Sequence, residues 1–391
     1  MDKIVVVGGG FGGFWSAVGA RRQYALANAA AQITVIDSDG FLTMRPRLYE
    51  AFGPHLRVPL PPLLQPLGIN LVISSVIAVD MNRQSVLTTT GEQISWDRLV
   101  VATGSVQQTL PVAGVDQHAF DVDTFAAAER LDQHLQGLFA QDEHPGRMTF
   151  VVVGAGFTGI ELACEMRRRI RVHATASVAS QARVVLIERA TEVGPQLGAN
   201  TRPAIVDALR NADVEVLLNT SITLVDDGSV SLSDGSIIPT RTVIIATGLK
   251  AHPLVSTFGA ALDASGRVIV DEFLRIPNRF GLFATGDTAH AKVDAEHTAL
   301  MSCQHAMTMG KYAGANVARD LLGLALKPYA QPNYQTCLDM GDYGALLTRG
   351  WDRTVVQAGT QTKAIKEMIN RQIIYPPMDD PDALLAAADV P

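Results

Sequence analysis

The chain has 391 residues, of which 47% are hydrophobic and 18% are charged, and its formal net charge is −7. The charged fraction lies below the ~25% of an average globular protein, so disorder is excluded for most of the chain. The negative charge argues against general affinity for nucleic acid or anionic lipid, and we expect no nucleic-acid partner. Three scattered cysteines are too few for a disulfide framework, and no metal site is expected.

The start of the chain and its hydropathy predict where the protein resides. The first expected strand begins at Lys3, which leaves no room for a signal peptide. No uncharged run approaches the ~18 residues that a transmembrane helix requires. We therefore expect a cytoplasmic protein without a transmembrane segment.

The first elements form a nucleotide-binding pattern. Residues 4–7 predict an apolar strand, residues 8–13 (Gly-Gly-Gly-Phe-Gly-Gly) contain a GxGxxG turn, and residues 14–24 predict a helix. Residues 33–36 predict a second strand, which ends in Asp37. In such a turn the glycines permit the bend, the approach of a diphosphate and the packing of the helix, and the acid binds a ribose diol. This order of elements favours a dinucleotide site over an empty glycine-rich turn.

The same pattern returns later in the chain. Residues 149–153 predict a strand, residues 154–159 (Gly-Ala-Gly-Phe-Thr-Gly) repeat the turn, and residues 160–170 predict the helix. Residues 184–187 predict a strand that ends in Glu188. Two such patterns in one chain rarely arise by chance. They predict that one bound nucleotide passes electrons to the other.

A third element occurs in both halves. Residues 99–102 predict a strand before Thr103-Gly104, and residues 243–246 predict one before Thr247-Gly248.

The acid of the second copy also predicts which nucleotide binds there. Glu188 would repel the 2′-phosphate of NADPH, so we expect NADH at this site. The neighbouring Arg189 leaves the alternative that it recruits this phosphate.

Between these motifs, several segments predict ordinary structural elements. Residues 123–140 have helical spacing of apolar side chains, and residues 144–146 (His-Pro-Gly) break this helix and predict a hinge. Alternating runs at 76–90 and 214–232 predict small antiparallel sheets. A further helix is expected at about 299–322.

A separate group of structural elements is expected from Lys327 onward. Strands are expected at 343–347 and 354–356, and a helix at 362–370. The acidic end after residues 376–377 (Pro-Pro) is expected to be a loosely held tail.

Together these motifs resemble the two-dinucleotide-binding flavoproteins, which have the pyridine nucleotide-disulfide oxidoreductase fold. The resemblance covers roughly residues 3–320. It implies an α/β protein with two Rossmann-like modules, of which the NAD module is inserted in the FAD module, and a short α+β C-terminal segment. The implied domains are 1–118 with 255–325 for FAD, 119–254 for NAD(H), and 326–391 as an interface or capping segment.

Within that family, four stretches resemble the type II NADH dehydrogenases, which are single-subunit NADH:quinone oxidoreductases. Residues 45–50 (Arg-Pro-Arg-Leu-Tyr-Glu) resemble a segment beside the flavin, and 158–163 (Thr-Gly-Ile-Glu-Leu-Ala) a segment near the nicotinamide. Residues 247–250 (Thr-Gly-Leu-Lys) resemble the end of the NAD module. Residues 303–310 resemble a motif that borders both the flavin and the quinone.

The resemblance assigns site residues by position. The strand at 282–285 followed by Gly286-Asp287 matches a second FAD motif, in which the acid binds the ribityl chain. Glu161 and Gln304 are the expected catalytic residues. For FAD the expected contacts are Gly8, Gly10, Phe11, Gly12, Gly13, Asp37, Arg45, Thr103, Gly104, Gly286, Asp287 and Gln304. For NADH they are Gly154, Gly156, Thr158, Gly159, Glu161, Glu188 and Gly248.

Two departures from the family pattern concern the electron acceptor. Thr308 and Met309 stand where Gln-Gln is usual. In type II enzymes this glutamine helps to form the quinone pocket, so the departure leaves a different acceptor open. The acceptor pocket is expected near Thr308, with Lys363 as a further candidate. Met309 fits core packing better than an apolar acceptor site. His305 is a candidate proton donor, but a lone helical histidine is more often structural.

The helix at 363–371 is the second departure. Its apolar stripe is flanked by basic residues, which is typical of peripheral membrane contact. A helix that covers the FAD domain or forms a homodimer interface fits its short length better.

We therefore expect an FAD-dependent NADH dehydrogenase that passes a hydride from NADH to FAD and two electrons to a quinone or quinone-like acceptor. One alternative is a soluble FAD-dependent oxidoreductase acting on a specific metabolite, and another is an NADH-dependent reductase of a small electron-transfer protein. Disulfide reductase chemistry is excluded because residues 41–49 contain no cysteine. Sulfide oxidation is disfavoured because Cys303 and Cys337 show no matching motif.

Overall fold

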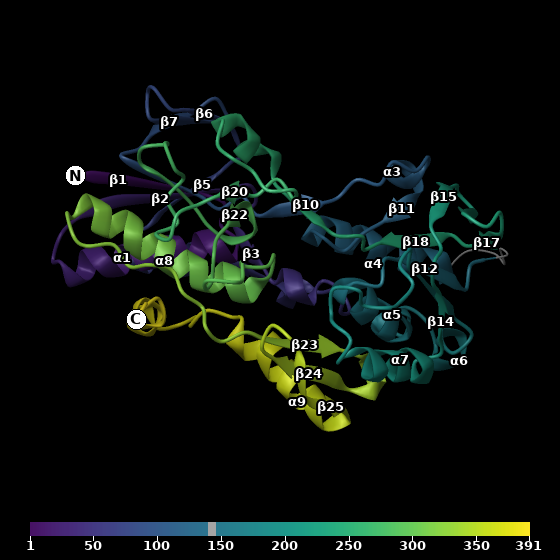
Figure 1. The fold of residues 1–391 in the computed structure, drawn as a ribbon. Coiled ribbons are helices and arrows are strands. Elements are labelled where there is room, and N and C mark those ends of the chain that lie inside the picture. The colour runs from purple at the N-terminus through teal and green to yellow at the C-terminus, as the bar shows by residue number, and fades with distance from the viewer. Residues whose placement is uncertain (140–145) are drawn as a thin grey trace.

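A computed structural model describes residues 1–139 and 146–391. Two lobes, each built around a parallel sheet, stand side by side, and the C-terminal segment (yellow) lies along their lower edge (Figure 1). The expected hinge at 144–146 falls partly on residues 140–145, so His144 and Pro145 lie outside the described residues.

The first lobe contains a parallel sheet in the order β21-β9-β1-β2-β5. Its strands are almost purely apolar, as is typical of parallel strands that are covered on both faces. On one side lie two helices, α1 (Phe11–Leu26) and α8 (Cys303–Leu321), which run next to each other (Figure 1). The strands are β1 (Asp2–Val7), β2 (Ala31–Asp37), β5 (Asn70–Ile73), β9 (Arg98–Val101) and β21 (Leu282–Ala284).

The second lobe repeats this plan with the order β11-β18-β12-β13-β14. The helices that follow its strands are α4 (Phe125–Phe139), α5 (Phe157–Ile170) and α7 (Arg202–Asn211). The strands are β11 (Ala119–Phe120), β12 (Thr149–Val153), β13 (Arg183–Ile187), β14 (Val214–Leu217) and β18 (Thr242–Ile245).

One expected sheet of this lobe needs a correction. Residues 214–217 are not antiparallel: β14 pairs in parallel with β13, because α7 provides the crossover between them. The antiparallel sheet begins only afterwards, with β15 (Ile222–Val225), β16 (Ser229–Leu232) and β17 (Ile237–Pro239).

Smaller elements connect the two sheets. The strands β10 (Ser105–Gln107) and β19 (Leu249–Ala251) pair antiparallel where the chain passes between the lobes. An antiparallel sheet formed by β6 (Val76–Asp80), β7 (Ser85–Thr88) and β8 (Gln93–Ser95) belongs to the first lobe. The other short elements are β3 (Phe41–Thr43), β4 (Arg57–Pro59), β20 (Val268–Ile269), β22 (Ala289–His290), α2 (Pro61–Leu64), α3 (Val115–His118) and α6 (Ala176–Ala179).

The C-terminal segment is a three-stranded antiparallel sheet with helices. Its strands are β23 (Gln335–Asp339), β24 (Ala345–Arg349) and β25 (Thr354–Gly359), and the sequence did not predict β23. The helix α9 (Thr360–Met368) continues as a π-helical turn over Ile369–Ile373.

The expectation of a loosely held tail is wrong. The last residues form α10 (Pro381–Ala387), which packs on α1. Leu384 of this helix and Val390 after it are both buried. Asp389 pairs with Arg22 at 2.9 Å. Asp380 caps the helix and Pro381 occupies its first turn, so the acidic and proline residues that suggested a tail are helix-start signals.

The packing of α1 against α8 leads to a stability prediction. A Cβ on Gly314 would lie 2.1 Å from the carbonyl oxygen of Ser16, whereas a Cβ on Gly137 in α4 would meet no described atom within 4 Å. We expect Gly314→Ala to lower the free energy of unfolding by about 2 kcal/mol, because the helices must separate. Gly137→Ala is expected to raise it by ~0.5–1 kcal/mol. Chemical denaturation of both variants measures this, and equal effects would contradict the packing.

Candidate active site

The first glycine turn is shaped by close backbone packing. Gly8 has a φ of +101°, and a Cβ on Gly13 would lie 1.8 Å from the Gly8 carbonyl oxygen. A Cβ on Gly10 would meet no described atom within 4 Å, so the backbone there is open to a ligand. Asp37 accepts hydrogen bonds from the Gly9 amide (2.7 Å) and the Gly40 amide (2.9 Å), which fix its carboxylate beside the turn.

The second turn has the same geometry. Gly154 has a φ of +105°, a Cβ on Gly159 would lie 1.8 Å from the Gly154 carbonyl oxygen, and Gly156 faces open space. Glu188 accepts hydrogen bonds from the amides of Ala155 (2.8 Å) and Ala190 (2.9 Å). A carboxylate has about four acceptor positions, so both acids can still bind a ribose diol.

One cavity of about 2000 Å³ connects the two turns. Gly13 and Gly159 lie outside its lining and serve helix packing instead. The expected site residues that line it are Gly8, Gly10, Phe11, Gly12, Asp37, Arg45, Thr103, Gly104, Gly154, Gly156, Thr158, Glu161, Glu188, Gly248, Gly286, Asp287, Gln304 and Thr308.

A charged group lies in this cavity where the lobes meet. Arg45 forms an ion pair with Asp123 and lies 3.5 Å from Asp287. Ser105 donates a hydrogen bond to Asp287 (2.6 Å) and accepts one from Arg45 (2.8 Å). Burial raises the pKa of Asp287, and the positive charge of Arg45 opposes this shift. The sequence did not single out Asp123 or Ser105, because neither belongs to a recognisable motif.

Several buried polar atoms of the cavity have no partner among the described residues. They are Gln304 Oε1, Thr285 Oγ1, Thr247 Oγ1 and Gln107 Nε2. Because unpartnered buried polar atoms are rare, these fit a polar cofactor such as a flavin dinucleotide. Thr308 donates its hydroxyl to the Gln304 carbonyl oxygen (3.2 Å), and Met309 is fully buried, which agrees with core packing.

Glu161 and Lys366 form a buried ion pair beside the second turn. Lys366 Nζ lies 2.8 Å from Glu161 Oε1, and both residues line the cavity. Burial raises the pKa of Glu161 to about 7, although Lys366 opposes the shift. Burial also disfavours the charge of Lys366, but the attraction of Glu161 and Asp339 raises its pKa.

A second lysine on α9, Lys363, was a further candidate for the acceptor pocket beside Thr308, but it is not among the residues that line the cavity. Its ammonium group contacts Glu165 (2.9 Å) and Asp339 instead. The two lysines are three residues apart on one helix, and the sequence pointed to Lys363, whereas Lys366 lines the cavity.

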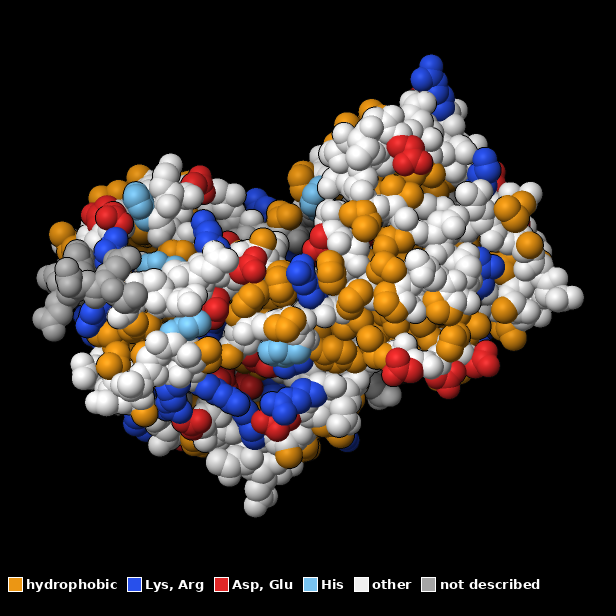
Figure 2. Space-filling view, turned by 180° about the vertical axis from the view of Figure 1, so that it is seen from behind, with side chains coloured by type: hydrophobic (Ala, Val, Ile, Leu, Met, Phe, Trp, Pro, Cys, Tyr) orange, Lys and Arg blue, Asp and Glu red, His pale blue; other side chains and the backbone are white. Residues whose placement is uncertain are grey.

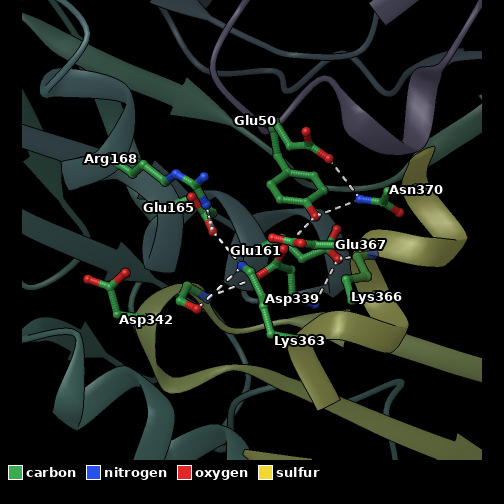
Figure 3. A network of polar contacts seen from close by, with 12 residues as sticks. Glu50, Glu161, Glu165, Arg168, Asp339, Asp342, Lys363, Lys366, Glu367 and Asn370 are labelled. Carbon is green, nitrogen blue, oxygen red and sulfur yellow. Dashed lines mark hydrogen bonds and ion pairs between the residues drawn. The ribbon is translucent and has the colours of Figure 1, made fainter. Parts of the chain in front are cut away.

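A polar network continues from this pair to the first lobe (Figure 3). The Tyr49 hydroxyl donates to Asp339 (2.9 Å), and Asn370 donates to Tyr49 (3.2 Å) and to Glu50 (2.8 Å). The Asp339 amide donates to Glu161 (3.0 Å). The network therefore joins α5, the 45–50 segment and α9.

The remaining titratable candidates are neutral at neutral pH. Burial lowers the pKa of His305 to about 4, and its Nδ1 lies 2.9 Å from the Ser302 hydroxyl, so the structural role is favoured. Burial raises the pKa values of Cys303 and Cys337 to about 11. Both are free thiols that line the cavity, and neither supplies a thiolate.

Residues 2–310 match the family described as pyridine nucleotide-disulphide oxidoreductase. The chain belongs to this family. It is an oxidoreductase with two modules of the same α/β plan.

Relatives support this membership. An NADH dehydrogenase-like protein of Mycobacterium tuberculosis is 41% identical over 396 residues, which is 100% of this chain and 98% of the relative. A type II NADH:quinone oxidoreductase of Staphylococcus epidermidis is 26% identical and covers 95% of each chain. The structure of NDH2 from Plasmodium falciparum in complex with NADH shares the fold, with a TM-score of 0.79 at 14% identity over 99% of this chain and 97% of that one.

The open backbone at Gly156 gives a binding prediction. A methyl group there would occupy the space that a diphosphate needs, so we expect Gly156→Ala to raise the Kd for NAD⁺ at least about tenfold. The free energy of unfolding should change by no more than about 1 kcal/mol. Gly159→Ala should instead destabilise the fold, because its Cβ would collide with the Gly154 carbonyl oxygen. Calorimetric titration with thermal unfolding distinguishes the two effects, and unchanged affinity in Gly156→Ala would contradict the site.

Proposed function

We propose that the protein oxidises NADH and reduces a quinone. The observation that carries the proposal is the single cavity that joins two dinucleotide-binding turns and extends to α9. The type II NADH:quinone oxidoreductase of Staphylococcus epidermidis, which aligns along 95% of the chain, supports quinone as the acceptor. The proposed division of the chain is 1–118 with 255–325 for FAD, 119–254 for NADH, and 326–391 as a capping segment.

The site residues are proposed to act as follows. The first turn and Asp37 hold the diphosphate and adenosine ribose of FAD, and Asp287 orients its ribityl chain. The second turn and Glu188 hold NADH. FAD, when bound, would supply the two-electron chemistry that connects NADH with the acceptor. Gln304 would accept a hydrogen bond from the bound cofactor through Oε1, which has no partner among the described residues.

Glu161 is proposed to hold the proton that the acceptor takes up. It is buried, lines the cavity, and has a pKa of about 7 because burial disfavours its charged form. A group with this pKa can both hold and release a proton at neutral pH. Lys366 fixes the orientation of its carboxyl group from α9.

The acceptor end of the cavity is proposed to be the part lined by α9 and the start of α8. Its apolar lining residues are Leu300, Met301, Met307, Ile365, Met368, Ile369 and Ile373, and polar groups come from Ser302, Gln304, Thr308, Lys366 and Asn370. Leu300, Met368 and Ile373 are also exposed, and we propose that they make peripheral contact with a membrane that holds the quinone. No described helix is long and apolar enough to span a bilayer. That the protein is cytoplasmic and that it forms a homodimer are still predictions from the sequence.

A small electron-transfer protein is the competing acceptor, and it would require a charged docking face. On the face shown in Figure 2, basic and acidic side chains are interspersed and apolar side chains cover much of the remainder. This face therefore presents no docking area of a single charge, which supports the small-molecule acceptor.

The pH dependence of quinone reduction tests the role of Glu161. Below about pH 7 the carboxyl group is protonated and can supply a proton, and above it the proton is lost. We expect the rate of flavin reoxidation by quinone to fall as the pH rises through 7. Glu161→Gln cannot titrate, so this step should disappear and the rate should drop at least about tenfold.

The matched control is Glu165→Gln. Glu165 is also buried on α5, but it contacts Lys363 and lies outside the cavity lining. This variant should keep the step near pH 7 in stopped-flow reoxidation. A step that survives in Glu161→Gln, or vanishes equally in both variants, would contradict the assignment.

An acceptor screen tests the proposed function as a whole. Steady-state NADH oxidation by the flavin-loaded enzyme is measured with a short-chain quinone, with ferredoxin and with oxygen alone. We expect the quinone to give the largest kcat/KM. If ferredoxin is reduced faster than the quinone, and this rate falls steeply as the salt concentration rises, a small electron-transfer protein is favoured as the acceptor. If none of the three acceptors supports NADH oxidation, an enzyme that acts on a specific metabolite is favoured.

A further inference from the structure

The tip of the β24–β25 hairpin contacts the module that contains the second glycine turn. Asn200 donates its side-chain amide to the Asp352 carbonyl oxygen (2.9 Å). A Cβ on Gly198 would lie 3.9 Å from Cδ of Arg353. The hairpin belongs to a different part of the chain, yet it packs against the loop around residue 198.

This loop is attached to the glycine turn itself. The Gly194 amide donates to the Ala155 carbonyl oxygen (3.0 Å), and the Ala155 amide donates to Glu188. Pro195, Gln196 and Leu197 line the same cavity as the turn. The hairpin tip is therefore separated from the diphosphate-binding turn by one short loop.

The strand β23 and the turn after it lie along α5 and run in the same direction as that helix. A Cβ on Gly341 would lie 2.6 Å from the Cys164 carbonyl oxygen, and the Asp339 amide contacts Glu161. The Cys337 carbonyl oxygen accepts from Lys366 (2.9 Å), whose Nζ lies 5.7 Å from the Phe157 ring.

Because Asp339 meets Glu161 and Gly341 meets Cys164, the earlier residues of β23 lie in the direction of the N-terminal end of α5. Thr336 is one of these earlier residues, and the second glycine turn precedes that end of α5.

Arg353 stands beside Thr336 and faces the cavity. Its Nη1 lies 3.4 Å from the Thr336 hydroxyl, and its guanidinium group lies 5.5 Å from the Tyr334 ring. Within residues 1–139 and 146–391, no acidic side chain forms an ion pair with it. Arg353, Thr336 and Tyr334 all line the cavity.

Aromatic packing holds the hairpin tip in place. Trp351 stacks on Tyr334 with ring centroids 4.5 Å apart, and on His297 of the first lobe, also at 4.5 Å. Stacked aromatic contacts of this kind keep neighbouring side chains in one geometry. These contacts fix the position of the hairpin tip that carries Arg353.

We propose that Arg353 binds the diphosphate of NADH from the side opposite the second glycine turn. The inference rests on the proposed function, because it deepens the assignment of that turn to NADH. A planar guanidinium group without an acidic partner matches phosphate oxygens, and a charge-assisted hydrogen bond is stronger than a neutral one. The nucleotide site is then formed by two parts of the chain: the inserted module supplies the second glycine turn, and the C-terminal segment supplies Arg353.

Calorimetric titration of the oxidised, flavin-loaded protein tests this proposal. The probes are ADP-ribose and NADP⁺, and the variants are Arg353→Met, Arg353→Lys and Arg349→Met. Arg349 lies on the same hairpin and is exposed, so it controls for the loss of one positive charge. We expect Arg353→Met to weaken both probes about tenfold, Arg353→Lys to weaken them less, and Arg349→Met to change neither.

Three results would overturn the inference. They are unchanged affinity in Arg353→Met, a loss confined to NADP⁺, which would assign Arg353 to the 2′-phosphate, and an equal loss in Arg349→Met. If Arg353→Met fails to fold, the comparison of Arg353→Lys with the parent protein decides the question. A parent protein that binds neither probe would instead refute the nucleotide site and the proposed function with it.

Discussion

The buried ion pair between Glu161 and Lys366 is the interaction on which the arrangement of the site depends. Removal of two charges from water costs several kcal/mol per ion, and only good geometry with further hydrogen bonds offsets this cost. Here the Asp339 amide binds Glu161, and the Cys337 carbonyl oxygen binds Lys366. The pair thereby fixes α9 against α5, and with it the apolar wall of the cavity.

The network extends this constraint to the first lobe. Lys363 contacts Glu165 and Asp339, and Tyr49 and Asn370 connect Asp339 to the 45–50 segment. Three parts of the chain that are remote in sequence therefore share one set of polar contacts. The two dinucleotide turns need only local glycine geometry, whereas the region between them requires all three parts to be in place. The C-terminal segment thereby forms part of the wall of the cavity.

The sequence predicted what is local and missed what depends on packing. Both glycine turns, with Asp37 and Glu188, could be located because their spacing follows from backbone geometry. The choice of Lys366 over Lys363 depends on the rotation of α9, which no local pattern encodes. The docked α10 was mistaken for a tail, because Asp380 and Pro381 are common both in helix starts and in loose ends. Arg353 carries no motif at all, and its position follows only from the hairpin.

The most direct test of the account is an anaerobic titration of the flavin-loaded protein with NADH, followed by a soluble quinone. The account predicts that NADH bleaches the flavin absorbance and that the quinone restores it within the time of one turnover. A flavin that NADH reduces but the quinone leaves reduced would contradict the acceptor. A flavin that NADH does not bleach at all would contradict the central claim that the two glycine turns hold an electron donor and its flavin acceptor.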